Sequence, residues 1–176
     1  MNYAEIKKHD TANGKGVRVS LFVSGCTHHC KGCFNSETWD FCFGKKYTQE
    51  IEDEIIEACQ QSYIKGLSVL GGEPFEKANQ KDVYALMKRF KKTFPNKDIW
   101  CYSGYLFDVD MIEGGKIHTE YTDEMLGCID YLVDGEFVEE LKNLRLKFRG
   151  SANQRVIDVK ESRKQGKTVV ISDENL

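Results

Sequence analysis

The sequence predicts a single α/β domain built on a mostly parallel sheet. Short apolar segments alternate along the chain with amphipathic helical patterns, which is typical of parallel strands joined by right-handed crossovers. The length of 176 residues suits one domain with its own core. A complete eight-unit barrel takes about 250 residues. We therefore expect either an open sheet or a partial (β/α) barrel.

The first half of the chain predicts strand, loop, helix and strand. Residues 17–23, VRVSLFV, are rich in valine and read as a strand that leads directly into a cysteine-rich loop. Thr48 is placed to cap the helix that follows. Residues at four-residue steps give this helix an apolar face: Ile51, Ile55, Cys59 and Tyr63. The segment LSVL, 67–70, predicts a buried strand that ends in two glycines.

The pattern continues with a second helix and a further strand. The helix is expected from about Gln80 to Phe94, where Pro95 ends it. Its apolar side carries Val83, Leu86, Met87, Phe90 and Phe94. DIWCY, 98–102, predicts the next strand, which ends in a Ser-Gly pair.

The last third gives weaker periodic signals. A short helix is expected over 122–127 with Thr122 as its cap, followed by a strand over 129–133. RVIDV (155–159) and KTVVI (167–171) have the composition of two strands that pair as a hairpin. We expect residues 1–160 to form the domain and 161–176 a short tail that can add a terminal strand.

Composition and charge exclude several classes of protein. The net charge of −3 gives no electrostatic footprint for nucleic acid. No segment approaches the ~20 apolar residues of a membrane span. The first ten residues, MNYAEIKKHD, lack the apolar core of a signal peptide. We therefore expect a cytoplasmic protein in a reducing compartment, without membrane or nucleic-acid partners.

The seven cysteines are an odd number, so they cannot all pair as disulfides. Disulfides are rare in a reducing compartment, and clustered cysteines there are better read as metal ligands. Four cysteines are scattered: Cys42, Cys59, Cys101 and Cys128. A lone cysteine usually acts as a small buried hydrophobic residue, and we expect that of these four.

The segment SGCTHHCKGCFN, 24–35, brings Cys26, Cys30 and Cys33 within eight residues. Thiolates hold iron–sulfur clusters and structural zinc. A cubane cluster held by three cysteines leaves one iron without a protein ligand, and that iron can bind a substrate or cofactor directly. The spacing CxxxCxxC, just after the first strand, matches the signature of radical S-adenosylmethionine enzymes.

The alternative is a closed zinc site, which needs a fourth ligand. Cys42 lies nine residues after the third cysteine and is one candidate. His28 and His29 are others, although they lie inside the tight loop where the geometry is awkward. For these two histidines we expect the simpler role of solvated loop residues.

The second motif is GGEP, 71–74, at the end of a predicted strand. Gly71 and Gly72 allow the backbone to approach a ligand closely. Backbone carbonyls and the Glu73 carboxylate can accept hydrogen bonds from an ammonium group, such as that of S-adenosylmethionine. Alone this turn is common, but one strand after CxxxCxxC it is far more specific.

Two further positions carry weaker signals. The ring of Phe34, or the backbone at Gly32, can lie against an adenine, although Phe34 can equally be a core residue. Ser103, at the next strand end, offers a hydroxyl suited to a ribose or a carboxylate. An ordinary turn accounts for Ser103 equally well.

Taken together, the chain resembles radical S-adenosylmethionine activating enzymes, and most closely the activating proteins of anaerobic (class III) ribonucleotide reductases. The similar stretches are NGKGVRVSLFVSGCTHHCKGCFN, LGGEP, DIWCYSGY, DYLVDGEF and FRGSANQRVID, which cover most of residues 13–158. Many superfamily members have an aromatic residue before the third cysteine. This chain has Gly32 there, as the reductase activators do, so the resemblance assigns the adenine contact to the segment Gly32–Phe34.

The resemblance implies a 4Fe-4S cluster on Cys26, Cys30 and Cys33. It implies an S-adenosylmethionine site made of Gly32, Cys33, Phe34, Gly71, Gly72, Glu73 and Ser103. The reduced cluster passes one electron to the sulfonium, whose S–C5′ bond breaks into methionine and a 5′-deoxyadenosyl radical. That radical takes a hydrogen atom from a glycine of the large subunit of the anaerobic ribonucleotide reductase. No acid–base side chain is required beyond the cluster and the cofactor, and an electron donor such as a flavodoxin is implied.

The segment from Lys142 to Arg155 carries further cations, which suit either a docking face for the reductase or a solvated surface. Within it, the family-like run RGSANQR draws attention to Arg149, Ser151, Asn153 and Gln154. Asp134 is equally suited to a turn and to a ligand contact. The alternative functions are an activase of another glycyl-radical enzyme of the pyruvate formate-lyase type, a radical enzyme for a quinoline-type small molecule, and a zinc-stabilised interaction module without catalysis.

Overall fold

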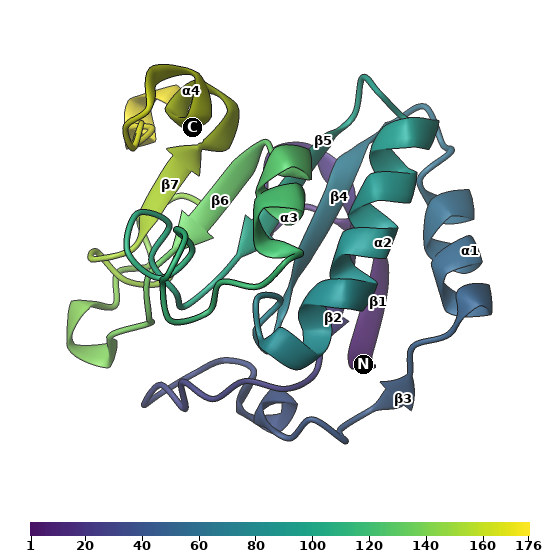
Figure 1. Ribbon diagram of the computed structural model, residues 1–176, viewed down its shortest axis with the longest axis horizontal. Coiled ribbons are helices and arrows are strands. Elements are labelled where there is room, and N and C mark those ends of the chain that lie inside the picture. Colours follow the sequence, from purple (N-terminus) through teal and green to yellow (C-terminus); the bar gives the residue numbers. More distant parts are fainter.

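The computed structural model describes residues 1–176 and contains one seven-stranded sheet with three helices packed against one face (Figure 1). The strands are β1 (Asn2–Asp10), β2 (Val17–Val23), β3 (Lys45–Lys46), β4 (Ile64–Gly71), β5 (Asp98–Tyr102), β6 (Tyr131–Asp134) and β7 (Arg155–Asp158). The helices are α1 (Gln49–Ala58), α2 (Lys77–Thr93), α3 (Thr122–Cys128) and α4 (Val159–Gln165). Short 3-10 helices span Ser36–Trp39, Glu139–Leu141 and Asp173–Asn175.

The strand order in the sheet is β3-β1-β2-β4-β5-β6-β7. The central strands β2, β4, β5 and β6 are parallel neighbours, as the alternation of strands and helices predicts. The strands added at both ends, β1, β3 and β7, pair antiparallel. Because β3 and β7 are the two ends of the order, the sheet is not closed. The prediction of a single α/β domain with a parallel centre is confirmed at this level.

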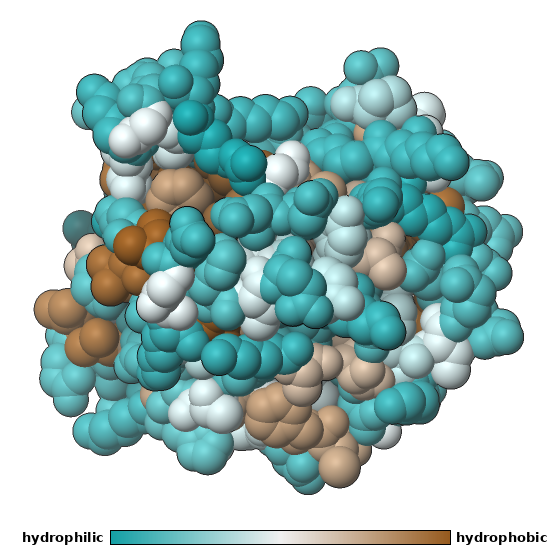
Figure 2. Space-filling model, in the orientation of Figure 1, coloured by the Kyte–Doolittle hydropathy of each residue, from teal (hydrophilic) through white to brown (hydrophobic).

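The two faces of the sheet have different characters. On β2, Val19, Leu21 and Val23 point to the main core, which fills the space between the sheet and the helices. The intervening Arg18 and Ser20 are also buried, but they face the opposite side. There a second, smaller cluster forms around Trp100, Val133 and Val156. On the helix-covered face of the molecule, apolar side chains surface only in small separate patches (Figure 2).

Two elements at the start of the chain were not predicted. Only Tyr3 and Asp10 of β1 are buried, so this strand has no regular apolar alternation to reveal it. Its backbone pairs with β2 and with the two-residue strand β3.

The predicted apolar face of the following helix is wrong at Tyr63, which is 54% exposed because α1 ends at Ala58.

The prediction that Thr122 caps α3 is wrong, because Thr122 is the first residue of the helix. Its hydroxyl donates to Gln80 Oε1 at 2.8 Å and accepts from Thr119 N at 2.9 Å. The bond to Gln80 holds the start of α3 against α2, and the bond from Thr119 N closes the turn before α3. The start predicted for α2 is also late, since the helix begins at Lys77.

The predicted C-terminal hairpin is correct in the segments that pair and wrong in the elements that they form. β7 pairs with β6, and α4 follows it immediately, with the Asp158 side chain accepting from Glu161 N. Residues 169–171 do lie antiparallel to 156–158, through the bridge between Val170 and Ile157 and two backbone hydrogen bonds, but they form no strand. None of the helices combines the length and apolar character that crossing a membrane requires.

Candidate functional site

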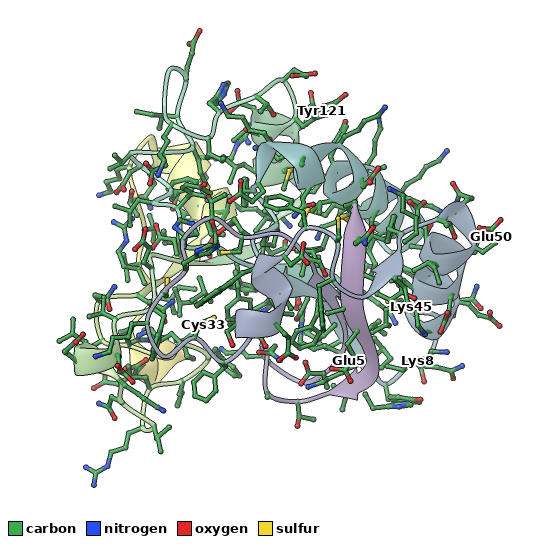
Figure 3. All side chains as sticks on the ribbon, turned by 90° about the horizontal axis from the view of Figure 1, so that it is seen from below. Glu5, Lys8, Cys33, Lys45, Glu50 and Tyr121 are labelled. Carbon is green, nitrogen blue, oxygen red and sulfur yellow. The ribbon has the colours of Figure 1, made fainter.

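The loops that follow the parallel strands line one cleft of about 540 Å³. Nearly all of the residues predicted for the site lie in its wall: Cys26, Cys30, Cys33, Phe34, Gly71, Gly72, Glu73 and Ser103. Gly32 is the exception: a Cβ there would meet the side chain of Glu139, which also does not line the cleft. Figure 3 views the molecule from this side and shows Cys33 next to the short helix of the cysteine loop. The strand ends therefore bring together residues that are far apart in sequence, as expected for a parallel sheet.

Backbone hydrogen bonds fix the first part of the cysteine loop. Gly25 N donates to Thr38 O at 2.8 Å, and Cys26 N donates to Trp39 O at 3.1 Å. Further along, Cys33 N donates to Cys30 O at 3.1 Å and closes a turn between the second and third cysteines. The start and the end of the loop are thus held side by side.

The three cysteines are free thiols with different exposures. Cys26 is buried, whereas Cys30 and Cys33 are half-buried. Burial raises the pKa of the Cys26 thiol to about 12, and burial also raises the pKa of Cys30. No three Cys, His, Asp or Glu side chains converge closely enough to define a metal site by geometry alone.

The donor set nevertheless fits an iron–sulfur cluster. Three free thiols line one cleft, and thiolates are the ligands of such clusters. A bound metal cation favours the thiolate forms of the cysteines that ligate it. The zinc alternative needs a fourth ligand, but Cys42 is exposed and does not line the cleft. The prediction that the scattered cysteines are buried is correct for Cys59 and Cys101 and wrong for Cys42, while Cys128 is half-buried.

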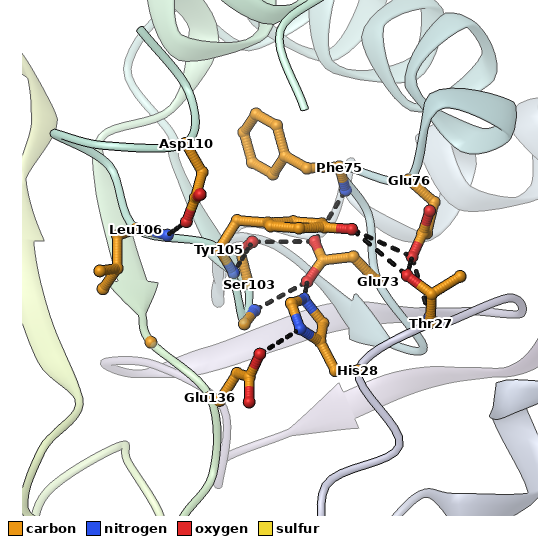
Figure 4. A network of polar contacts seen from close by, with 12 residues as sticks. Thr27, His28, Glu73, Phe75, Glu76, Ser103, Tyr105, Leu106, Asp110 and Glu136 are labelled. Carbon is orange, nitrogen blue, oxygen red and sulfur yellow. Dashed lines mark hydrogen bonds and ion pairs between the residues drawn. The ribbon is translucent and has the colours of Figure 1, made fainter. Parts of the chain in front are cut away.

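Glu73 is the hub of the strand-end loops (Figure 4). Its side chain is 1% exposed. Oε1 accepts from Phe75 N at 2.8 Å and from Ser103 Oγ at 2.9 Å, and Oε2 accepts from Gly104 N at 2.7 Å. His28 Nε2 lies 3.2 Å from Oε2. The carboxylate thus joins the loops after β2, β4 and β5, and the Ser103 hydroxyl is used within this network.

The prediction that His28 is a solvated loop residue is wrong. Its side chain is 5% exposed, and Nδ1 lies 2.9 Å from Glu136 Oε1. Its ring centroid lies 4.3 Å from that of Tyr105. Burial lowers the pKa of His28, but the contacts with Glu73 and Glu136 outweigh it and hold the pKa above its usual value. His29 is exposed, as predicted, and stacks on Trp39.

The two glycines of GGEP allow close contact between backbones. A Cβ on Gly72 would lie 2.6 Å from Gly25 O and 3.0 Å from Thr38 O. Gly71 has a φ of +106°, and a Cβ there would lie 2.8 Å from backbone atoms of Phe22 and Val23. Gly72 N donates to Val23 O at 2.7 Å, and Glu73 N donates to Gly25 O at 2.8 Å. Gly72 therefore serves the contact with the cysteine loop and Gly71 the contact with the end of β2, and both line the cleft.

Helix α2 holds the same loops from behind. Glu76 Oε1 accepts from Thr27 N at 2.9 Å and from Thr27 Oγ1 at 2.6 Å. Asn79 Nδ2 donates to Ser24 O at 2.9 Å and to Glu73 O at 3.0 Å. Sequence reasoning missed Glu76 and Asn79. Their position just after GGEP, at the start of a helix, was the available signal.

Phe34 and the segment from Lys142 to Gly150 line the outer part of the cleft. Phe34 is 70% exposed, so the alternative reading of a core residue is wrong. Its ring centroid lies 6.2 Å from that of Phe137, and Lys142 Nζ lies 4.8 Å from the Phe34 centroid. Leu144, on the same wall, is 87% exposed. This rim presents apolar surface next to cations.

The residues of the RGSANQR run make internal contacts. Arg149 forms a two-pronged ion pair with Asp173. Gln154 Oε1 accepts from Gly150 N at 2.9 Å, while its Nε2 donates to Gly135 O at 2.9 Å. Ser151 Oγ accepts from Val138 N, and Asn153 Nδ2 donates to Glu136 O. The run thus fixes the loop after β6.

Asp134, at the end of β6, has a structural role in the same region. It is fully buried, and its Oδ2 accepts from Phe107 N at 2.9 Å. Arg155 bonds to both of its carboxylate oxygens. These contacts favour a structural role of Asp134 in the turn over a contact with a ligand, the two roles between which the sequence does not decide.

Comparisons with known proteins agree with this geometry. A family model described as a 4Fe-4S single cluster domain matches residues 12–157. The anaerobic ribonucleoside-triphosphate reductase-activating protein of Vibrio cholerae is 45% identical over 157 residues, covering 88% of this chain and 96% of that protein. The proteins of the same name from Escherichia coli K12 and Enterobacteria phage T4 are 39% and 38% identical, covering 88% and 89% of this chain and 96% and 93% of their own lengths. The chain therefore belongs to the family of anaerobic ribonucleoside-triphosphate reductase-activating proteins and carries a 4Fe-4S single cluster domain.

Proposed function

We propose that this protein uses a 4Fe-4S cluster to cleave S-adenosylmethionine reductively and so generates a glycyl radical on an anaerobic ribonucleotide reductase. The observation that carries the proposal is the shared cleft: three free thiols and the Glu73 hub lie together at the carboxyl ends of parallel strands. In this proposal the unclosed sheet is the partial barrel of a radical S-adenosylmethionine enzyme.

The protein residues position the reactants and exclude water. Cys26, Cys30 and Cys33 would hold the cluster, which supplies one electron for cleavage when it is bound. The loop after β4, with Gly71, Gly72 and Glu73, forms the wall that would receive the methionine ammonium. The carboxylate already accepts three hydrogen bonds, so the carbonyls of the loop are needed as further acceptors.

The relatives' name supplies the protein substrate, an anaerobic ribonucleoside-triphosphate reductase. A glycine carried on a protein loop needs an open approach to the cleft. The rim around Phe34 and Leu144 is exposed and apolar, and Lys142 lies beside it, which suits contact with another protein. An electron donor such as a flavodoxin would reduce the cluster. Activation of another glycyl-radical enzyme is the alternative, which the same cleft would support.

The decisive experiment compares Cys26→Ala with Cys42→Ala after anaerobic reconstitution with iron and sulfide. We expect the parent protein and Cys42→Ala to be brown, to contain iron, and to form methionine and 5′-deoxyadenosine from S-adenosylmethionine and dithionite. Cys26→Ala should lose this cleavage, because a cubane needs its three protein thiolates. Cys42 is the matched control, since it lies outside the cleft.

Two further measurements complete the test. The large subunit of an anaerobic ribonucleotide reductase is added, and the glycyl radical is recorded by electron paramagnetic resonance. Undiminished deoxyadenosine formation by Cys26→Ala, or a colourless parent protein that binds zinc, would overturn the proposal. A glycyl radical on a formate-lyase-type enzyme but none on the reductase would change the substrate and leave the chemistry intact.

A further inference from the structure

His28 connects the cysteine loop to three other loops (Figure 4). It is the middle residue between Cys26 and Cys30. One ring nitrogen lies 2.9 Å from Glu136, after β6, and the other lies 3.2 Å from Glu73, after β4. The ring packs on Tyr105, after β5. No other side chain of the cysteine loop has a hydrogen bond or an ion pair with the Glu73 carboxylate.

Gly104 makes room for this ring. A Cβ on Gly104 would lie 2.6 Å from both Cδ2 and Nε2 of His28. The backbone N–H of the same residue donates to Glu73 Oε2 at 2.7 Å. The loop after β5 therefore supports the carboxylate through its backbone and leaves space for the ring that faces it.

The two contacts of His28 differ in quality. The Nδ1 contact with Glu136 meets the criteria of a hydrogen bond, whereas Nε2 faces Glu73 Oε2 without such alignment. The three aligned donors to Glu73 are Phe75 N, Ser103 Oγ and Gly104 N. His28 thus limits the position of the carboxylate from the side of the cysteine loop, while Glu136 and Tyr105 hold His28 itself.

We propose that His28 is a positioning residue that sets the place of the Glu73 carboxylate relative to the cysteines that flank the histidine. This inference rests on the proposed function. A ligand that bridges a metal centre on the cysteines and the loop that holds Glu73 requires a fixed separation between the two. Residues that orient the groups around a metal centre typically contribute 10–100-fold to affinity or activity, so loss of His28 should weaken binding of the sulfonium ligand by about tenfold.

The test uses reconstituted full-length variants with His28→Phe as the central one. Phenylalanine keeps a ring against Tyr105 and removes both ring nitrogens. We expect iron content and the signal of the reduced cluster without ligand to match the parent protein. The KM for S-adenosylmethionine should rise about tenfold with a smaller change in kcat. The ligand-induced change in the electron paramagnetic resonance signal, measured without turnover, should need correspondingly more ligand. His29→Ala, in the same loop but exposed, is the control and should behave as the parent.

Two more variants separate positioning from general loop stability. His28→Gln places an amide near the position of Nε2 and should recover part of the affinity, whereas His28→Asn, which mimics Nδ1, should not. Gly104→Ala displaces the His28 ring without removing any of its atoms, and it should also raise the KM for S-adenosylmethionine.

The inference is overturned if His28→Phe and Gly104→Ala bind S-adenosylmethionine like the parent, or if His29→Ala weakens binding equally. It is also overturned if His28→Phe loses its iron and His28→Gln does not regain affinity, because the histidine would then act on loop folding alone. Failure of the parent protein itself to cleave S-adenosylmethionine would instead contradict the proposed function. The parent measurement therefore tells the two failures apart.

Discussion

Gly72 has no space for a side chain, because two loops contact each other through their backbones at this position. Gly25 O and Thr38 O stand within 3.0 Å of where a Cβ would be. These atoms belong to the cysteine loop and cannot rotate away as a flexible side chain would. The contact between GGEP and the cysteine loop is therefore set by the smallest residue in the chain.

Gly72→Ala should lower the free energy of unfolding by about 1–3 kcal/mol, because the methyl group forces two backbone segments apart. Urea unfolding of the metal-free protein measures this effect directly. Gly127→Ala is the control, since it lies in α3 and its nearest atom to a Cβ is 3.9 Å away. That change should be neutral or stabilising by up to about 1 kcal/mol through helix propensity. Equal destabilisation by the two variants would contradict the steric explanation.

Residue chemistry also explains which parts of the site were predictable. Cys26, Cys30, Cys33 and Glu73 carry their signal in local spacing, and they do lie in one cleft. His28 and Glu136 are 108 residues apart, and neither has a local pattern that points to the other. Their contact depends on the order of the strands, which a single sequence does not specify.

At the scale of elements, Asp130 joins three of them. Its side chain accepts from Lys91 on α2, from Lys160 on α4 and from Ile99 N on β5. Burial raises the pKa of this carboxyl, but the hydrogen bonds from Lys160 and Lys91, and that from Ile99 N, outweigh it and hold the pKa below its usual value. A lowered folded-state pKa means that the ionised form stabilises the fold.

Asp130→Asn should therefore cost about 2 kcal/mol of stability at pH 7, since it leaves two lysines without their carboxylate. The difference between parent and variant should persist above the usual aspartate pKa of about 4 and shrink as pH falls below it, through the lowered folded-state pKa. Denaturant unfolding of the parent and the variant at several pH values between about 2.5 and about 7 measures this difference in stability. A difference that stays constant down to the lowest pH would contradict the assignment.

Whether an element could be predicted from the sequence depends on how that element is stabilised. β2, β4, β5 and β6 are buried strands in the centre of the sheet, so their apolar composition made them predictable. β1 is mostly polar and depends on pairing with β2, which leaves little trace in its own sequence. After β7 the run of β-branched residues suggested a hairpin, but the Asp158 cap starts a helix there.

At the scale of the whole molecule, the site and the core are separate. Neither of the two hydrophobic clusters contains Cys26, Cys30 or Cys33. The main core lies between the sheet and helices α1, α2 and α3, and backbone bonds already hold the ends of the cysteine loop. The fold thus differs from small zinc domains, in which the metal site itself supplies the folding energy.

Removing the iron with a chelator should therefore bleach the protein without unfolding it. We expect the far-ultraviolet circular dichroism spectrum and a single cooperative thermal transition to remain. The Tm should fall only by the contribution of metal binding to the folded state. Loss of the cooperative transition after chelation would show that the centre is structural and would favour the zinc-type alternative.

The two borders of the sheet have a consequence for how another protein can bind. One border is formed by β3, which pairs only with Asn2 and Tyr3, and by the rest of β1, which exposes the charged residues Glu5, Lys7 and Lys8. The other border is β7, which the bridge at Val170 partly covers. Short, charged or covered borders do not template an additional strand. Recognition by backbone extension of the sheet is thereby disfavoured, and an incoming polypeptide is directed to the opening formed by the loops. Because the borders are short, charged or covered, they also disfavour self-association through strand pairing at the high protein concentrations that spectroscopy requires.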